Sequence, residues 1–208
     1  MIVAIGRELG AGGREVGELI AERLGVELLD KQIVDLVAAR LGAPASYVEA
    51  HDENVEGFVD RLFRVITSAY PEAYAAEGIP DWSEERLVEL TGSIIKEHAA
   101  THSLVVIGRG APMLLRDRRD AVRAFITAPF DVRVQRLQTR TGCALDFATR
   151  EVKKSDQHRL AYMRQHYNVD WRDPGLYDVV LNTEHLSAEA AAEIVIAAGN
   201  RLPVESRW

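Results

Sequence analysis

Short apolar runs and longer amphipathic stretches alternate along the chain. Five largely apolar runs are typical of strands buried in a parallel sheet, and they occupy residues 2–5, 26–30, 104–108, 121–128 and 177–183. Helical patterns cover residues 13–24, 33–41, 131–141 and 144–166. Strands that alternate with helices predict an α/β fold, in which a mostly parallel sheet is covered by helices on both faces.

Single residues mark several helix ends. Gly25 follows the first helix in the position where glycine commonly ends a helix. Pro129 begins the helix after the fourth strand, where proline is tolerated. Ser187 is expected to cap a final alanine-rich helix, and residues 167–175 are predicted to form a loop.

One segment interrupts the alternation. Residues 45–102 have an almost wholly helical pattern, broken near residues 70–82, and they separate the second strand from the third. A helical stretch between two strands predicts an inserted subdomain. The chain has no internal repeats, low-complexity tracts or long linkers, so we expect a single domain over residues 1–208.

Composition limits the class of protein. At 208 residues and 47% hydrophobic content, the chain can bury one sizeable core. No apolar run approaches the roughly 18 residues that span a bilayer, and the first residues lack a basic leader and a cleavage site. The single cysteine, Cys143, fits a reducing compartment, so we expect a cytoplasmic protein with no membrane partner. The net charge of −7 argues against a nucleic-acid partner, and the sequence does not indicate an oligomeric state.

Positive charge is concentrated in one segment. Residues 133–164 hold eight basic side chains and three acidic ones, a net charge of +5 in a chain whose total is −7. Such a segment predicts a binding site for a small polyanion, and a solvent-exposed helix face is the alternative. Arg133, Arg136 and Arg140 follow an i, i+3, i+7 spacing, so one helix face can present all three.

A glycine-rich loop joins the first strand to the first helix. The stretch "GRELGAGGREV" (residues 6–16) has the strand–loop–helix order that a phosphate-binding loop requires. Backbone N–H groups of Gly10, Ala11, Gly12 and Gly13 would approach phosphate oxygens, and the helix N-terminus would add its dipole. A plain tight turn is the alternative.

This loop departs from the full pattern GxxxxGK[ST]. Arg7 stands at the position of the first glycine and Gly13 replaces the lysine. If "GAGGRE" overlays the usual ending GxGKxT, Glu15 replaces the magnesium-binding hydroxyl. Arg14 is the cation nearest the vacant lysine position, and it either reaches a phosphate bidentately or points into solvent. Glu15 either orients Mg²⁺ through water or stabilises the first helical turn.

Four segments together carry a resemblance to a known family. The segments "GRELGAGGREVGELIAERLGVELLDKQIV", "VVIGRGA", "DQHRLAY" and "WRDPGLYDVVLNT" resemble the cytidylate kinase-like family, which belongs to the nucleoside monophosphate (NMP) kinases among the P-loop kinases. The resemblance covers nearly the whole chain, keeps the motif order and is weakest over residues 45–100. In that family the loop has Gly-Gly-Arg where ordinary cytidylate kinases have Gly-Lys.

The resemblance implies a three-layer P-loop kinase fold. It consists of a five-stranded parallel sheet with a helical NMP-binding insertion and a mobile lid. Placed on this chain, the core covers residues 1–44, 103–141 and 176–208, the insertion covers residues 45–102 and the lid covers residues 142–175. The lid coincides with much of the basic segment.

The resemblance also implies the substrates and the residues that hold them. Phosphoryl transfer depends mainly on positioning and charge neutralisation, and in this family the donor is ATP with Mg²⁺. The glycine loop would cradle the donor β-phosphate, with Arg14 in a catalytic and binding role and Glu15 beside it. Arg136 would be catalytic and Arg140 would bind the donor, because this helix lends arginines to the phosphates in NMP kinases.

Acceptor residues are implied at two strand ends. Arg109 lies in "GRG" after the third strand, at the carboxyl edge where open α/β sheets bind ligands. Cytidylate kinases have "GRD" there, and its arginine holds the acceptor, so Arg109 would bind the acceptor phosphate; Gly110 stands in place of the aspartate. Asp30 matches the family's "LD" at the acceptor pocket, and an N-cap for the next helix is the alternative or additional role.

Lid residues complete the candidate site. Asp156 and Arg159 resemble the "DxxR" of the lid, in which the arginine clamps phosphate and the aspartate orients it, so both are candidate catalytic residues. Arg150 and Lys153 are candidate substrate-binding residues of the same segment. Closing such a lid would exclude water and favour transfer over hydrolysis.

No protein metal cage is expected. The histidines lack zinc-ligand spacing and one cysteine is available, so Mg²⁺ would arrive with the nucleotide; the histidines are His51, His98, His102, His158, His166 and His185. Cys143 is interpreted as a packing residue rather than a nucleophile, and Trp82, Trp171 and Tyr177 are expected to pack.

The predicted function is a nucleoside monophosphate kinase that transfers the ATP γ-phosphate to CMP or dCMP. Retention of Arg109, Asp156 and Arg159 favours this enzyme. The missing loop lysine and hydroxyl, with Gly110, favour an alternative in which the protein binds nucleotide as a regulator or sensor with little kinase activity. A kinase for another small acceptor is a third possibility, because the acceptor motif is incomplete.

Overall fold

A five-stranded parallel sheet forms the centre of the protein. The structure is a computed structural model that describes residues 1–30, 32–40 and 84–202. The strand order is β2-β3-β1-β4-β5, and every pairing is parallel. The strands are β1 (Ile2–Arg7), β2 (Glu27–Leu29), β3 (Leu104–Ile107), β4 (Ala121–Thr127) and β5 (Val179–Asn182). The predicted α/β fold with five parallel strands is confirmed.

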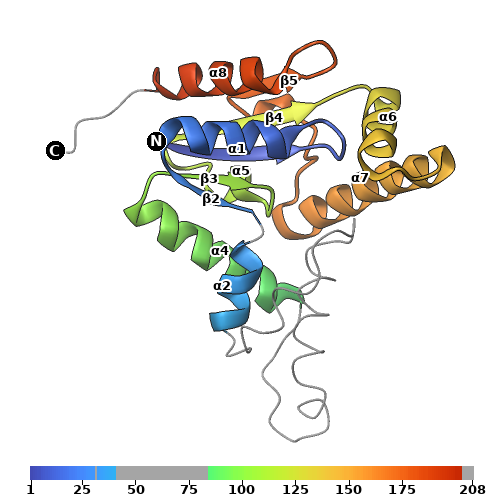
Figure 1. Cartoon of the computed structure of the whole chain (residues 1–208). Helices are drawn as coiled ribbons and strands as arrows, with labels where there is room; N and C mark the ends of the chain where they lie inside the picture. Colours follow the sequence, from blue (N-terminus) through green and yellow to red (C-terminus); the bar gives the residue numbers. More distant parts are fainter. Residues whose placement is uncertain (31, 41–83, 203–208) are drawn as a thin grey trace, which may run out of the picture.

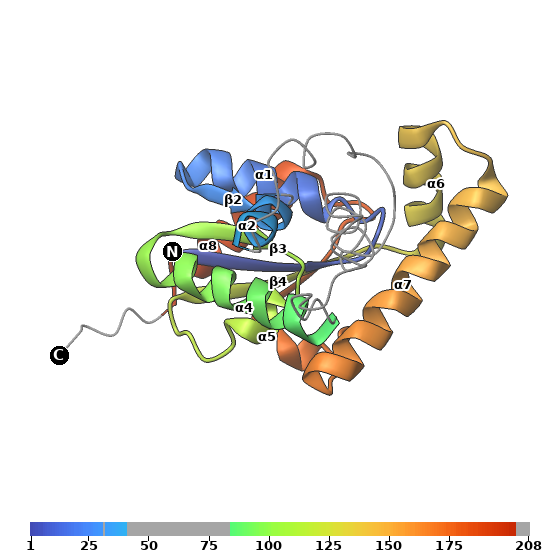
Figure 2. The same ribbon diagram turned by 90° about the horizontal axis from the view of Figure 1, so that it is seen from below.

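Helices cover both faces of this sheet (Figures 1 and 2). One face carries α1 (Gly13–Leu24) and α8 (Ala188–Gly199), and the other carries α2 (Gln32–Arg40), α4 (Glu84–Thr101) and the short α5 (Ala111–Leu114). Successive residues of a strand point to opposite faces. In β1, therefore, Ile2 and Ala4 pack in the core with α4, while Val3 and Ile5 pack with α1 and α8.

Two further helices lie together beside one end of the sheet in both views (Figures 1 and 2). They are α6 (Phe130–Thr141) and α7 (Leu145–Tyr167), and a small apolar cluster joins them. Cys143 packs against this cluster, as predicted. Because α6 follows directly on β4, this helix pair lies at the carboxyl edge of the sheet, where the glycine loop also lies.

The predicted helix ends agree closely with the structure. Gly25 ends α1 in the left-handed conformation, with φ of 61°. Ser187 caps α8, its Oγ accepting a hydrogen bond from the backbone N–H of Ala190 at 3.2 Å. A 3-10 turn at Pro174–Leu176 extends from the predicted loop, and α5 is a short element that the sequence pattern did not reveal.

Much of the predicted insertion lies outside the described residues. The described part contains α4, which the prediction assigns to the insertion and which packs against the sheet through Leu87, Ile94, Ile95 and Ala99. The expected helix break at residues 70–82 and the packing of Trp82 fall outside the described ranges. In the described part of the chain, no helix is both long enough and apolar enough to cross a membrane.

Candidate functional site

Two glycines of the loop adopt a left-handed backbone conformation. Gly10 and Gly12 have φ of 84° and 78°, a conformation that favours glycine. A Cβ atom on Gly10 would lie 2.5 Å from the carbonyl oxygen of Arg133, so α6 approaches the loop too closely for a side chain there. Gly12 is the N-cap residue of α1, and no side chain caps that helix in the described structure. The first N–H groups of α1 are thus available to an anion.

Hydrogen bonds hold the loop in place from both sides. The backbone N–H of Ala11 donates to the carbonyl of Glu8 at 3.2 Å. The hydroxyl of Thr183, at the end of β5, donates to the carbonyl of Ala11 at 2.8 Å. The loop is therefore tied to the strand that precedes it and to the far edge of the sheet.

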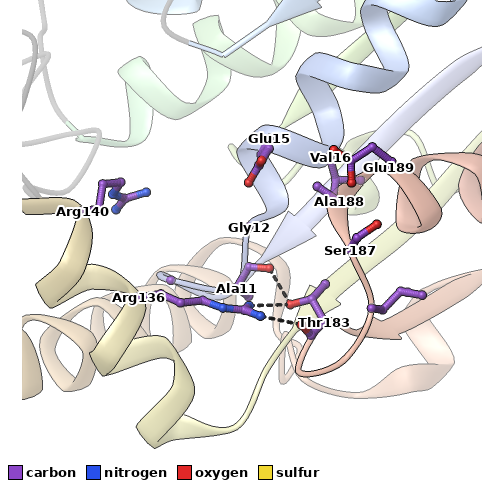
Figure 3. A pocket seen from close by; sticks show the side chains of 12 residues that line it. Ala11, Gly12, Glu15, Val16, Arg136, Arg140, Thr183, Ser187, Ala188 and Glu189 are labelled. Atoms are coloured by element: carbon purple, nitrogen blue, oxygen red, sulfur yellow. Dashed lines mark hydrogen bonds between the residues drawn. The ribbon is translucent and has the colours of Figure 1, made fainter.

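An open cavity of about 460 Å³ lies over this loop (Figure 3). This volume falls within the usual range for small-molecule sites. The cavity combines backbone of the loop with two arginines of α6 and the segment that leads into α8; its lining residues are Gly10, Ala11, Gly12, Glu15, Val16, Arg136, Arg140, Thr183, Leu186, Ser187, Ala188 and Glu189. Five members of the predicted loop, residues 10–12, 15 and 16, and both predicted α6 arginines thus line one cavity.

The two α6 arginines in the cavity differ in their contacts. Arg136 donates to the Thr183 hydroxyl at 3.0 Å and to its carbonyl at 2.6 Å, so it helps to build the cavity wall. Arg140 is exposed, and within the described residues it makes no hydrogen bond or ion pair. Figure 3 shows both on the α6 side of the cavity. Arg140 is accordingly the one with the freer guanidinium.

Arg14 and Asp30 lie together beside the loop. The Nε atom of Arg14 is 2.9 Å from a carboxylate oxygen of Glu18 and 3.6 Å from one of Asp30. Asp30 is buried at the end of β2, whereas half of the Arg14 side chain is exposed. Arg14 therefore already has acidic partners from the chain itself.

Arg109 has an unusual backbone. Its φ is 56°, and it lies between Gly108 and Gly110, whose φ values are 74° and 68°. Residues other than glycine rarely adopt positive φ, and such conformations concentrate at functional sites. A Cβ atom on Gly110 would collide with the hydroxyl of Tyr167, and burial raises the pKa of this hydroxyl. Both the backbone and Tyr167 therefore disfavour an aspartate at position 110.

A group of four charged residues, buried at Glu8 and Arg133 and exposed at Arg172, joins the loop to α6 and α7. The guanidinium of Arg133 donates to both carboxylate oxygens of Asp156, at 3.1 and 3.0 Å, and lies 3.3 Å from Glu8. Arg172 lies 2.8 Å from Glu8 and 2.7 Å from Asp156. We call these residues the paired group. Asp156 thus makes its ion pairs with Arg133 and Arg172, and none with Arg159 in the described structure.

Arg159 lies close to this group without a carboxylate partner in the described structure. Its Nη1 donates to the hydroxyl of Ser155 at 2.7 Å, and its guanidinium lies 5.7 Å from the ring centre of Trp171. Burial and the positive charge of Arg7 lower the pKa of Arg159 to about 9, although Asp156 opposes this shift. A buried cation next to another cation is unfavourable until an anion joins them.

The remaining predicted residues of α7 lie apart from these contacts. Arg150 is exposed, and Lys153 places its Nζ 5.8 Å from the ring centre of Phe130 on α6. Neither lines the cavity, and no described interaction joins either to Asp30. Their acceptor role therefore remains a prediction.

Four residues of this region were missed by sequence reasoning: Arg7, Glu8, Arg172 and Thr183. Arg7 had a usable signal, because a charged residue at the first glycine position of the loop pattern is unusual. Glu8 and Arg172 are distant in sequence, so no local spacing connects them. Trp171 and Tyr177 pack with Phe125, as expected. Among the described residues, no three His, Cys, Asp or Glu side chains gather as metal ligands.

The comparisons with known proteins agree with this geometry. Residues 2–185 match the model of the cytidylate kinase-like family. The chain belongs to this family. Over 78 residues it is 32% identical to the cytidylate kinase of Natronomonas pharaonis, a match that covers 38% of this chain and 41% of that protein. It is 23% identical to the cytidylate kinase of Methanobrevibacter smithii over 94% of this chain and 96% of that protein.

Solved structures of other proteins share the fold of this cytidylate kinase-like chain. A crystal structure of an uncharacterized protein from Eubacterium ventriosum aligns with a TM-score of 0.70 at 22% identity, covering 97% of this chain and 99% of that one. A gluconokinase from Sinorhizobium meliloti aligns with a TM-score of 0.53 at 15% identity, covering 97% and 92%. These likenesses show the P-loop kinase fold, and the family supports nucleotide phosphotransferase as the class of function.

Proposed function

We propose that the protein is a nucleoside monophosphate kinase that transfers the γ-phosphate of ATP to CMP or dCMP. The observation that carries this proposal is the glycine loop, which opens into a cavity at the carboxyl edge of the sheet, beside several guanidinium groups. Relatives that match nearly the whole chain are cytidylate kinases. Positioning and charge neutralisation are what phosphoryl transfer requires of a protein.

The donor ATP would lie in the cavity over the loop. Backbone N–H groups of residues 10–13 and the start of α1 would hold the β-phosphate. Arg140 would add a cation from α6, and Arg136 would keep Thr183 and the cavity wall in place. Mg²⁺ bound to the phosphates would neutralise part of their charge. The Glu15 carboxylate lines the same cavity and offers the oxygen ligands that this ion prefers, directly or through water.

The acceptor would lie at the ends of β2 and β3. Arg109 would bind the acceptor phosphate, while Asp30 would orient Arg14 and the acceptor side of the site. Tyr167 occupies the space beside Gly110 where the family at large has an aspartate. The rest of the predicted acceptor site falls in residues 45–83, outside the described ranges.

Transfer would proceed by in-line displacement. An oxygen of the acceptor phosphate attacks the γ-phosphorus, the bond to the bridging oxygen of ADP breaks, and ADP leaves with that oxygen. Arg159 would stabilise the charge on the transferred group. Asp156 would act indirectly, by fixing Arg133 and Arg172 around the loop. Arg150 and Lys153 would reach the acceptor when the lid segment closes over it.

A turnover assay tests this proposal. The purified protein is incubated with ATP, Mg²⁺ and each nucleoside monophosphate in turn, and release of ADP is followed. CMP and dCMP should give the highest kcat/KM. Absence of turnover with every monophosphate, together with measurable ATP affinity, would contradict the enzyme and favour a nucleotide-binding regulator.

A kinase for another small acceptor is the second candidate. Tyr167 beside Gly110 favours it, because the usual aspartate of the acceptor site is absent. The same assay with a panel of small alcohols and acids separates the candidates. Turnover confined to one of those compounds would replace CMP as the acceptor.

A further inference from the structure

The loop of this protein lacks its usual cation. In a phosphate loop a lysine after the second glycine reaches the β- and γ-phosphates, and here Gly13 stands at that position. Arg14 follows it, but its Nε already lies 2.9 Å from Glu18 and 3.6 Å from Asp30 at a half-exposed site. Arg14 is thus partly neutralised by the chain itself, and a second cation at the position of the lysine would strengthen the binding of a polyphosphate.

The side chain of Arg7 occupies the space into which a side chain at position 13 would point. Arg7 is the last residue of β1, directly before the loop. A Cβ atom on Gly13 would lie 2.5 Å from Cβ and 3.0 Å from Cγ of Arg7. Backbone at the start of α1 and the aliphatic part of Arg7 are therefore in direct contact, and only glycine fits between them.

The other end of Arg7 lies against the end of β3. A Cβ atom on Gly108 would collide with Nη1 of Arg7 and lie 2.9 Å from its Cζ. Gly108 directly precedes Arg109, the candidate acceptor-phosphate residue. The guanidinium of Arg7 thus lies between the donor loop and the acceptor strand, where the transferred phosphate has to pass.

Charge around Arg7 is poorly balanced by the chain. Within the described residues, no hydrogen bond or ion pair reaches its guanidinium. Burial lowers the pKa of Arg7 and Arg14 lowers it further, while Asp30 opposes them. Arg7 in turn lowers the pKa of Arg159. Half-buried guanidinium groups without a carboxylate partner favour the binding of an anion, and a phosphate can bind two such groups bidentately.

We propose that Arg7 supplies the phosphate-binding cation of this loop in place of the lysine, holding the γ-phosphate beside Arg159, which acts on the charge that develops there during transfer. This inference rests on the proposed nucleotide kinase function and names the residue that makes the altered loop competent. The inference also accounts for the absence of a side chain at Gly13 and Gly108, because a side chain at either position would displace Arg7. Lysine at 13 and arginine at 7 are thus alternative solutions that exclude each other.

An exchange of the two positions tests this directly. The double variant Arg7→Gly/Gly13→Lys converts the loop to GELGAGKR, which satisfies the GxxxxGK part of the usual pattern. We expect Arg7→Gly and Gly13→Lys each to lower kcat at least about 100-fold, the typical cost of losing one transition-state donor. The double variant should regain at least about tenfold over Arg7→Gly, a coupling that additive effects cannot produce.

Binding of inorganic tripolyphosphate and of ATP gives a readout independent of turnover. Isothermal titration of Arg7→Gln should show about a 10- to 100-fold loss of affinity for both ligands, as expected for a lost charge-assisted hydrogen bond. Arg7→Lys should recover part of it. Arg118→Ala is the matched control and should bind both ligands as the wild type does. Arg118 pairs with Asp120 in the segment that precedes β4, at the opposite end of this strand from the glycine loop. Circular dichroism and thermal unfolding confirm that each variant is folded.

The outcomes separate this inference from the proposed function. Tripolyphosphate and ATP binding that depends on Arg7, without turnover of any acceptor, would support Arg7 as the phosphate cation and contradict the kinase. Normal turnover and affinity in folded Arg7→Gln would overturn the role of Arg7 and leave the kinase intact. Wild-type protein that binds neither ATP nor tripolyphosphate would overturn both.

Discussion

Two sets of arginines lie close together at the carboxyl edge of the sheet, and they differ in what balances their charge. Arg133 and Arg172 belong to the paired group, where each lies within 3.3 Å of both Glu8 and Asp156. Arg7 and Arg159, which we call the uncompensated pair, make no ion pair with a carboxylate in the described structure. The chain supplies paired carboxylates for one set, and under our proposal a bound phosphate would supply the anion for the other.

The presence or absence of a carboxylate partner therefore predicts which arginines stabilise the fold and which ones bind a ligand. A buried charge is costly unless it is paired and hydrogen-bonded. The paired group meets this condition without ligand, so its removal should mainly affect folding. The uncompensated pair meets it only when an anion binds, so its removal should mainly affect binding and rate.

The largest expected effect comes from breaking the paired group. Arg133→Met would leave the buried carboxylates of Glu8 and Asp156 with less positive charge, and we expect a loss of about 3–5 kcal/mol in the free energy of unfolding. Urea denaturation measures it. Arg164→Ala, an exposed arginine of α7, is the control and should change this free energy by less than about 0.5 kcal/mol. Equal stability of Arg133→Met and Arg164→Ala would show that the paired group is not structural.

The next effect concerns the uncompensated pair. Arg159→Ala should lower kcat about 100-fold while retaining most nucleotide affinity, because its guanidinium acts on charge that develops during transfer. Its unfolding free energy should stay near that of the wild type, since no carboxylate loses a partner. Lys154→Ala, an exposed neighbour on the same helix, should leave kcat unchanged. Wild-type kcat in Arg159→Ala would remove this residue from the site.

A smaller effect is expected when an anion is added to the folded protein. Tripolyphosphate at 100 times its dissociation constant should stabilise the wild type by about 2.7 kcal/mol, because it binds only the folded state. Sodium chloride at matched ionic strength should not. The stabilisation should decrease in Arg7→Gln, and thermal unfolding with and without ligand measures both values. The same stabilisation in both proteins would mean that the anion binds elsewhere.

The smallest effect belongs to Arg140, at the exposed rim of the cavity. Exposed charges contribute at most about 1 kcal/mol, so Arg140→Ala should raise the KM for ATP by no more than about fivefold and leave kcat nearly unchanged. Initial rates at varied ATP concentration test this. A large fall in kcat would instead place Arg140 with the uncompensated pair.

The sequence allowed much of the fold to be predicted, because the signals involved are local. Apolar runs identify strands that are buried on both faces, and β1 and β3 are such strands. Gly25 and Ser187 act on their own helix ends, so neighbouring residues suffice to recognise them. The position of Arg109 follows from the same logic, since it comes directly after a strand.

The partners of the charged residues could not be predicted in the same way. Arg14 is next to Gly13 in sequence, and its predicted role as loop cation stays a prediction. Its ion pair with Glu18, one helical turn away, could not be foreseen from the loop pattern. Arg7 lies on the strand side of the loop, and only the packing of α1 and β3 brings it to the phosphate position. The pairing of Glu8 with Arg172 joins distant segments, which periodicity does not reveal.

Gly13 and Gly108 are coupled to each other through the Arg7 side chain, because a side chain at either glycine would collide with it. Substitutions at positions 7, 13 and 108 should therefore not act independently, because a larger residue at either glycine would displace the Arg7 side chain. Loss of Arg7 would make room for a lysine at position 13, whereas Gly108, whose φ is 74°, would still favour glycine. A change from one version of the loop to the other by single substitutions would therefore pass through a form that either lacks its cation or places two side chains in the same space.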